Sequence, residues 1–225
     1  DLLDQSLAID PANAAALSLA AECHAQAVLV RWGKDPEAHR RAGLDFAKQA
    51  LRVAPDDPEV VSRALVSLWQ LGENLQSVVK LADRAVALNP GSALALGVSG
   101  WLRLLMGRTA AAAEQLEQSQ QLDPISPDSA LRLSGLAITR FCAGAYDDAA
   151  AMLHDAIRRK PAAQLNYVML AACQALLGDM AAANAALADF HAVSPDGDPT
   201  AWLGALGDPA QRQIAEDAIR QVLAA

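Results

Sequence analysis

Four histidines are the side chains of this sequence best suited to binding a metal ion or moving a proton. No two of them stand four residues apart, and none has a glutamate in the register that a zinc-binding helix requires. Cys23 precedes His24, but neighbouring helical residues point about 100° apart and cannot chelate one ion together. The spacing therefore predicts exposed histidines and no metal site. The four are His24, His39, His154 and His191.

The acidic residues and the glycines are equally poor candidates for catalysis or cofactor binding. Asp56-Asp57 and Asp147-Asp148 stand where helices are expected to begin, and carboxylates there interact favourably with the helix dipole. Asp196-Gly197-Asp198 resembles part of a calcium loop but lacks the glutamate that follows in such loops, so a turn is predicted. The glycines are scattered and form no phosphate-binding loop. We therefore expect no catalytic residue and no cofactor.

Cys23, Cys142 and Cys173 form no recognisable motif. Their odd number is typical of free thiols in a reducing compartment, so the sequence predicts a cytoplasmic protein. With no ligand spacing among them, we expect these cysteines to be packed in the interior.

Composition narrows the fold and the partners. The 225 residues are 53% hydrophobic but only 4% aromatic, which favours an all-helical chain and excludes a large β domain and a disordered one. A net charge of −8 and a pI of about 4.9 argue against nucleic-acid binding. The longest apolar stretch, residues 14–30, is interrupted by Glu22, His24 and Gln26, so no membrane span is predicted. The sequence begins at Asp1 with neither Met nor a signal peptide, so we expect targeting information to have been trimmed away.

The elements that position these residues come from an internal repeat. Six prolines follow similar helix endings, 34 to 37 residues apart after a first interval of 44. Because a helix does not continue comfortably through proline, each one closes a unit of about 34 residues, the period of tetratricopeptide repeats. The prolines are Pro11, Pro55, Pro90, Pro124, Pro161 and Pro195.

A glycine divides each of the last four units, 17 or 18 residues before the closing proline. Glycine readily adopts the left-handed conformation that ends a helix, so each marks a turn between two helices. These glycines are Gly72, Gly107, Gly144 and Gly178. The second helices of the last three units are accordingly expected to begin at Thr109, Tyr146 and Met180.

The pattern resembles the tetratricopeptide (TPR) repeat. Residues 144–149, Gly-Ala-Tyr-Asp-Asp-Ala, followed by Leu153, Ala156 and Pro161, are similar to the second helix of that repeat. The resemblance implies an all-α fold, an α–α superhelix or TPR solenoid. It has a leading half-repeat (1–11), five repeats (12–57, 58–91, 92–127, 128–161 and 162–197) and a C-terminal cap (198–225). Asp208-Pro209 is expected to start the capping helix.

A narrower resemblance concerns the order of the units. A long first repeat, then residues 88–101, 122–128 and 141–146, are together similar to the C-terminal repeat regions of bacterial class III adenylate and guanylate cyclases. Related regions occur in winged-helix transcriptional regulators. In both groups the catalytic or DNA-binding domain lies upstream. The resemblance therefore implies a non-catalytic interaction and regulatory segment of a larger signalling protein.

In the TPR family the concave face is lined by fixed positions of the first helices. Carried over to this chain, these positions are mainly apolar and lack the lysine, arginine and asparagine of carboxylate clamps. They predict a groove for a protein or peptide segment, for a second copy of the chain or for a small molecule. Alternatively, the chain fills its own groove with Trp202, Leu203 and Leu206. The positions singled out are Glu22, Gln26, Val66, Trp69, Gln70, Trp101, Leu104, Leu105, Ile138, Phe141 and Leu176.

Overall fold

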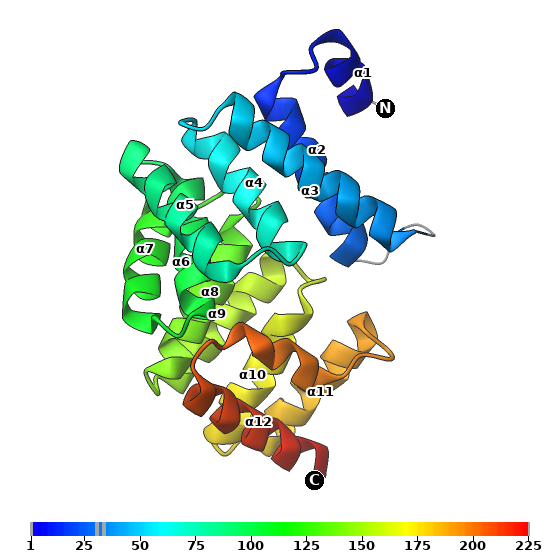
Figure 1. Ribbon diagram of the computed structural model, residues 1–225. Helices are drawn as coiled ribbons and strands as arrows, with labels where there is room; N and C mark the ends of the chain where they lie inside the picture. Colours follow the sequence, from blue (N-terminus) through cyan, green and yellow to red (C-terminus); the bar gives the residue numbers. More distant parts are fainter. Residues whose placement is uncertain (1, 30–31, 33–34, 225) are drawn as a thin grey trace. The chain divides into compact units, whose positions relative to one another are not determined.

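The computed structural model describes residues 2–29, 32 and 35–224. Over these residues the chain forms twelve α-helices and one 3₁₀ helix, and no strand (Figure 1). The elements are α1 (Leu2–Ile9), α2 (Ala14–Leu29), α3 (Pro36–Val53), α4 (Pro58–Gln70), α5 (Leu75–Leu88), α6 (Ala93–Leu105), α7 (Thr109–Leu122), α8 (Ser129–Cys142), α9 (Tyr146–Arg159), α10 (Gln164–Leu176), α11 (Met180–Val193), η1 (Pro199–Ala205) and α12 (Pro209–Ala224).

Two compact units make up the chain, Asp1–Ser99 and Gly100–Ala225, and the division falls inside α6. Within each unit, helices that follow one another in sequence pack together. In the described part of the chain no helix combines the length and apolar character that a membrane span requires.

The predicted turn glycines have the predicted conformation. Gly72, Gly107, Gly144 and Gly178 have φ angles of +91°, +71°, +77° and +84°, where a side chain would be strained. The helices after the last three begin at Thr109, Tyr146 and Met180, as expected from the sequence. The glycine signal is therefore confirmed as the boundary between the two helices of a repeat.

The first unit is built around the hairpin of α2 and α3. Asp35 caps α3 by accepting a hydrogen bond from the Ala38 amide at 2.9 Å, and Pro36 occupies the first helical turn. Gly43 allows the two helices to approach closely, because a Cβ there would lie 3.1 Å from the His24 Cβ. α4 packs against both helices.

The second unit has one continuous core in which Leu116 of α7 is central. A Cβ on Gly100 of α6 would lie 2.7 Å from the Leu116 Cγ, and one on Gly135 of α8 would lie 2.8 Å from its Cδ1. The Leu116 side chain therefore packs against both glycines, and the three helices approach closely because neither glycine has a side chain. Gly100 is the small first-helix residue that the TPR pattern predicts.

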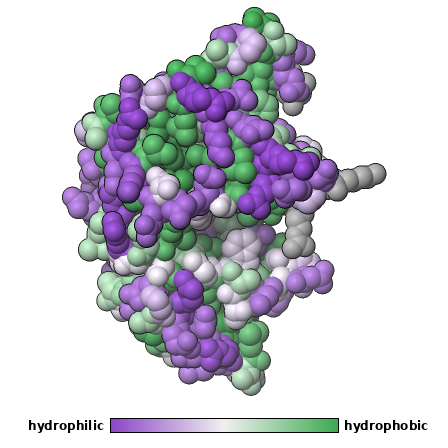
Figure 2. Space-filling model, viewed as in Figure 1, coloured by the Kyte–Doolittle hydropathy of each residue, from purple (hydrophilic) through white to green (hydrophobic). Residues whose placement is uncertain are grey.

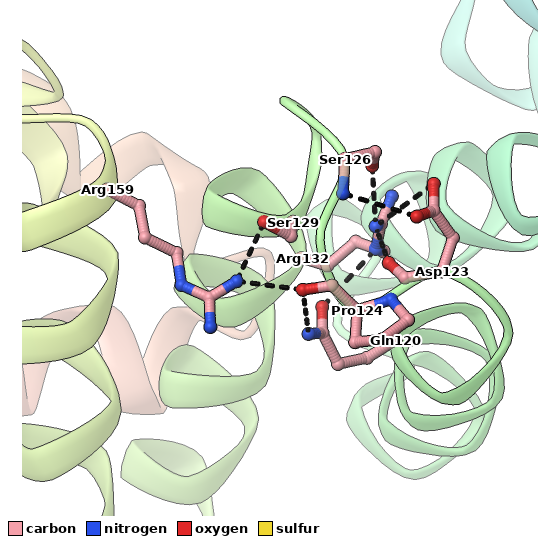
Figure 3. A network of polar contacts seen from close by, with 7 residues as sticks. All are labelled: Gln120, Asp123, Pro124, Ser126, Ser129, Arg132 and Arg159. Carbon is pink, nitrogen blue, oxygen red and sulfur yellow. Dashed lines mark hydrogen bonds and ion pairs between the residues drawn. The ribbon is translucent and has the colours of Figure 1, made fainter.

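A buried arginine holds the loop between α7 and α8 (Figure 3). Arg132 is 3% exposed, and its guanidinium donates to the Asp123 carbonyl, to Ser126 Oγ at 2.9 Å and to Gln120 Oε1 at 3.3 Å. Burial lowers the pKa of Arg132, and the nearby Asp123 carboxylate opposes that shift. From α9, Arg159 donates to the Pro124 carbonyl at 2.8 Å. The loop is thus fixed by charge-assisted hydrogen bonds from two helices.

The C-terminal segment returns to the core of the second unit. Asp198 caps η1 by accepting from the Thr200 amide at 2.8 Å, and Asp208 caps α12 by accepting from the Ala210 amide at 2.8 Å. The predicted start of the last helix at Asp208-Pro209 is therefore confirmed. Arg212 of α12 donates to the carbonyl of Leu206, the residue that follows η1, at 2.7 Å. Both η1 and α12 pack against α10.

Candidate functional site

The groove positions predicted in the second unit are mostly buried. Ile138 and Phe141 of α8 are fully inaccessible, and Leu104 of α6 is nearly so. Trp101 is 8% exposed, and its indole nitrogen donates to the Leu131 carbonyl at 3.0 Å. These side chains offer no free surface to a partner in this conformation.

The chain's own C-terminal segment belongs to the same core. Leu203 and Leu206 are fully buried in one hydrophobic cluster with the groove residues of α6 and α8, and Trp202 packs against that cluster. The linker after η1 also presses on the end of α6, since a Cβ on Gly207 would overlap the backbone of Leu105. The groove residues of α6 and α8 and the C-terminal residues Leu203 and Leu206 therefore share one core.

Two other predicted positions of this unit lie at helix ends. Leu105, the last residue of α6, is half-buried and lies against Gly207. Leu176, the last residue of α10, is 37% exposed.

The predicted positions of the first unit are more accessible. On α2, Gln26 is exposed and Glu22 is half-buried, accepting a hydrogen bond from Arg63 of α4 at 3.0 Å. On α4, Val66, Trp69 and Gln70 are all half-buried. The surface of this unit therefore keeps a mixed polar and apolar character.

A hollow of about 270 Å³ lies beside α2 and includes two of these predicted positions. Trp32 on its rim is 77% exposed, and Leu19 is 41% exposed. The lining residues are Leu19, Glu22, Cys23, Gln26, Ala27 and Trp32. Sequence reasoning missed Leu19, Cys23, Ala27 and Trp32. The signal was available, because residues 19, 23 and 27 recur every four positions and lie on one helix face.

A second hollow, of about 780 Å³, lies in the second unit among the first turn of α7, the last turn of α8 and the start of α12. Two of its three charged lining residues have partners. Arg140 donates to Glu117 at 2.7 Å, and Asp208 caps α12. Cys142 is half-buried there, and burial raises its pKa to about 11, so the thiol stays protonated near neutral pH.

The cysteines and histidines differ in part from expectation. Cys173 is buried as expected, with a pKa raised by burial to about 12, but Cys23 is exposed. His154 and His191 are exposed as expected, whereas His24 and His39 are half-buried and in contact. The expectation was wrong for Cys23, which lies on the open face of α2. It was wrong for His24 and His39 because the antiparallel hairpin brings together residues equidistant from its turn.

No group of three or more His, Cys, Asp or Glu side chains in the described part of the chain is arranged to hold a metal ion.

Similarity to known proteins is confined to structure. No protein-family model matches the chain, and no curated protein matches it. Among solved structures, one similar chain comes from the crystal structure of the APC/C hetero-tetramer Cut9–Hcn1. The match covers 98% of the present chain and 38% of the Cut9–Hcn1 chain, with a TM-score of 0.73 and 15% sequence identity. The match to PilW, a type IV pilus biogenesis factor, covers 90% of the present chain and 98% of the PilW chain, with a TM-score of 0.62 and 17% sequence identity. The match to MamA from Desulfovibrio magneticus RS-1 covers 81% of the present chain and 97% of the MamA chain, with a TM-score of 0.55 and 18% sequence identity.

These likenesses show the fold. Together with the glycine turns and the paired helices, they establish an all-α fold of the α–α superhelix class, of the TPR type.

Proposed function

We propose that this chain is a protein-interaction scaffold, the C-terminal TPR region of a larger bacterial signalling protein whose upstream effector is an adenylate or guanylate cyclase. The TPR-type fold supports the scaffold role, because repeat folds present extended surfaces on which other chains dock. The order of the repeat units and their resemblance to cyclase C-terminal regions support the effector. A fold alone assigns no function, so the docking surface carries the rest of the proposal.

The observation that carries the proposal is the open surface of α2. Trp32 and Leu19 expose large apolar area next to the half-buried carboxylate of Glu22. An exposed aromatic residue beside a hollow is typical of the residues that dominate binding energy at protein interfaces. In the second unit most of the predicted groove positions are buried, whereas Leu19 and Trp32 beside the hollow of the first unit are exposed.

The partner's contact segment then has a defined chemistry. It presents one or two apolar side chains to the hollow and a hydrogen-bonding group to Gln26, since Glu22 is already paired with Arg63. An amphipathic helix provides such groups at helical spacing, because its apolar anchors recur every three or four residues.

The scaffold role is tested with the intact protein, isolated by affinity tag from its native cells and analysed by quantitative mass spectrometry. We expect a discrete partner that is lost from a Leu19→Ser, Trp32→Ala double variant. Ile125→Ser is the matched control, because Ile125 is 90% exposed but lies on the loop after α7. A partner set that is unchanged in the double variant, or reduced equally in the control, contradicts the proposal.

The effector is tested by the coding sequence that precedes Asp1 and by cyclic-nucleotide formation in the full-length protein. We expect a class III cyclase domain upstream and a rate of ATP or GTP cyclisation that changes in the double variant. A winged helix upstream would instead assign a transcriptional regulator and end the cyclase proposal.

A further inference from the structure

Two histidines face each other across the α2–α3 hairpin, and neither the fold nor the proposed scaffold role accounts for them. The Nδ1 atoms of His24 and His39 lie 2.9 Å apart, and the ring centroids are 5.1 Å apart at an angle of 47°. Both rings are half-buried, so the side chains are held by packing while one side remains open to solvent.

We propose that His24 and His39 form a binding site for a divalent transition-metal ion, with one imidazole nitrogen supplied by each helix of the hairpin. Neutral imidazole nitrogen is a common ligand of zinc, copper and nickel ions. Two such nitrogens already converge here from different helices, which is the step that usually costs ordering entropy when a site forms.

The surrounding residues prepare the pair for this role. Phe46 of α3 stacks on the His24 ring, with centroids 5.6 Å apart and an angle of 19°. Gly43 lets the hairpin close at this level, since a side chain there would crowd His24. Burial, and secondarily the neighbouring His39, lower the pKa of His24, while the Asp4 carboxylate of α1 opposes that shift.

The proton balance is simple. When neither ring of the metal-free pair carries a charge, one Nδ1–H donates to the other Nδ1. When a metal ion takes both Nδ1 lone pairs, the shared proton moves to Nε2 of the same ring through solvent. No net proton is released from the neutral pair, and no redox step is involved. With two protein ligands, water completes the coordination, and binding is weaker than in closed four-ligand zinc sites.

The site is tested by isothermal titration calorimetry of the 225-residue chain with zinc chloride near neutral pH. We expect one saturable zinc ion per chain and an upward shift of the melting temperature that saturates with it. Single His24→Gln and His39→Gln variants should each lose this binding. His154→Gln is the matched control, since His154 is exposed, and Cys23→Ser tests whether the adjacent thiol supplies a ligand. Both controls should bind as the wild type does.

A spectroscopic measurement keeps the test independent of how the variants fold. With Cu²⁺ as the probe, electron paramagnetic resonance of the wild-type protein should show coupling to two imidazoles. Coupling to one imidazole only, zinc binding that persists in His24→Gln, or binding lost in either control overturns the proposal. Absence of zinc binding at millimolar concentration overturns it as well. Because these readouts involve no partner, their failure leaves the scaffold function untouched.

Discussion

Replacing Gly207 by alanine is the most direct way to ask whether the C-terminal segment seals the groove of the second unit. Gly207 lies between η1 and α12, and a Cβ at this position would overlap the backbone carbon and oxygen of Leu105 and the amide nitrogen of Gly107. Backbone atoms cannot rotate out of the way as a flexible side chain can. The linker must therefore move away from the end of α6.

The cost follows from two terms. Overpacking of a well-packed site costs about 1–3 kcal/mol, and the reduced freedom of the unfolded chain returns about 0.4–1 kcal/mol. If the linker shifts only locally, the free energy of unfolding should fall by about 1–2 kcal/mol. If it detaches, the buried Leu203 and Leu206 become exposed, and the loss grows to about 3–6 kcal/mol at roughly 1.5–3 kcal/mol for each leucine.

Urea denaturation followed by tryptophan fluorescence measures the loss, and binding of an apolar dye reports whether the two leucines are uncovered. Gly204→Ala is the matched control three residues earlier, because a Cβ there meets no atom within 4 Å. The control should change stability by no more than about 0.5 kcal/mol. A Gly207→Ala protein as stable as the control would refute the view that this linker is packed tightly on α6.

Three further outcomes are expected. Replacing Arg132 by methionine leaves buried acceptors without a donor, so the free energy of unfolding measured in urea should fall by about 1–3 kcal/mol. Proteolysis in the loop after α7 should also become faster. The control Arg158→Ala removes an exposed ion pair and should lower the free energy of unfolding by less than about 1 kcal/mol. A thiol reagent at pH 8 should modify Cys23 alone by mass spectrometry, since burial keeps the other two thiols protonated, and a second rapid modification would contradict their burial. Above pH 9 the unfolded chain loses the Cys173 proton that the folded chain retains up to about pH 12, so this thiol should contribute a fall in stability of about 1.4 kcal/mol per pH unit in that window. Cys142 should add a similar contribution up to about pH 11. A Cys173→Ala variant should show a shallower fall than the wild type, and an equal slope would contradict the buried thiol.

The repeat was predictable because its signals are local. A glycine that must adopt positive φ and a proline that ends a helix act within a few residues, and Gly144 with Pro161 placed α9 correctly. The 3₁₀ helix η1 begins with the capping residue Asp198 and with Pro199, but these local signals do not specify its packing against α10.

The sequence left open whether the predicted groove is filled by the chain's own C-terminal segment. A position rule identifies which face of a first helix Phe141 occupies, but it does not say whether that side chain is buried. In the structure Phe141 shares a buried core with Leu203 and Leu206, some sixty residues further along the chain. The His24–His39 contact was easier to predict from the sequence than the burial of Phe141, because the two histidines are nearly equidistant from the turn of an antiparallel hairpin.

The position of Leu116 between Gly100 and Gly135 has a consequence for evolution and engineering. Repeat arrays are commonly lengthened or shortened by copying or deleting whole hairpins, which presumes that each hairpin is self-contained. Here one side chain fits sockets contributed by the helices on both sides, so transplanting α6 and α7 without α8 would set a leucine against whatever residue replaces Gly135. We therefore expect an array that separates α6, α7 and α8 to pack less well at that junction than one that keeps the three helices together.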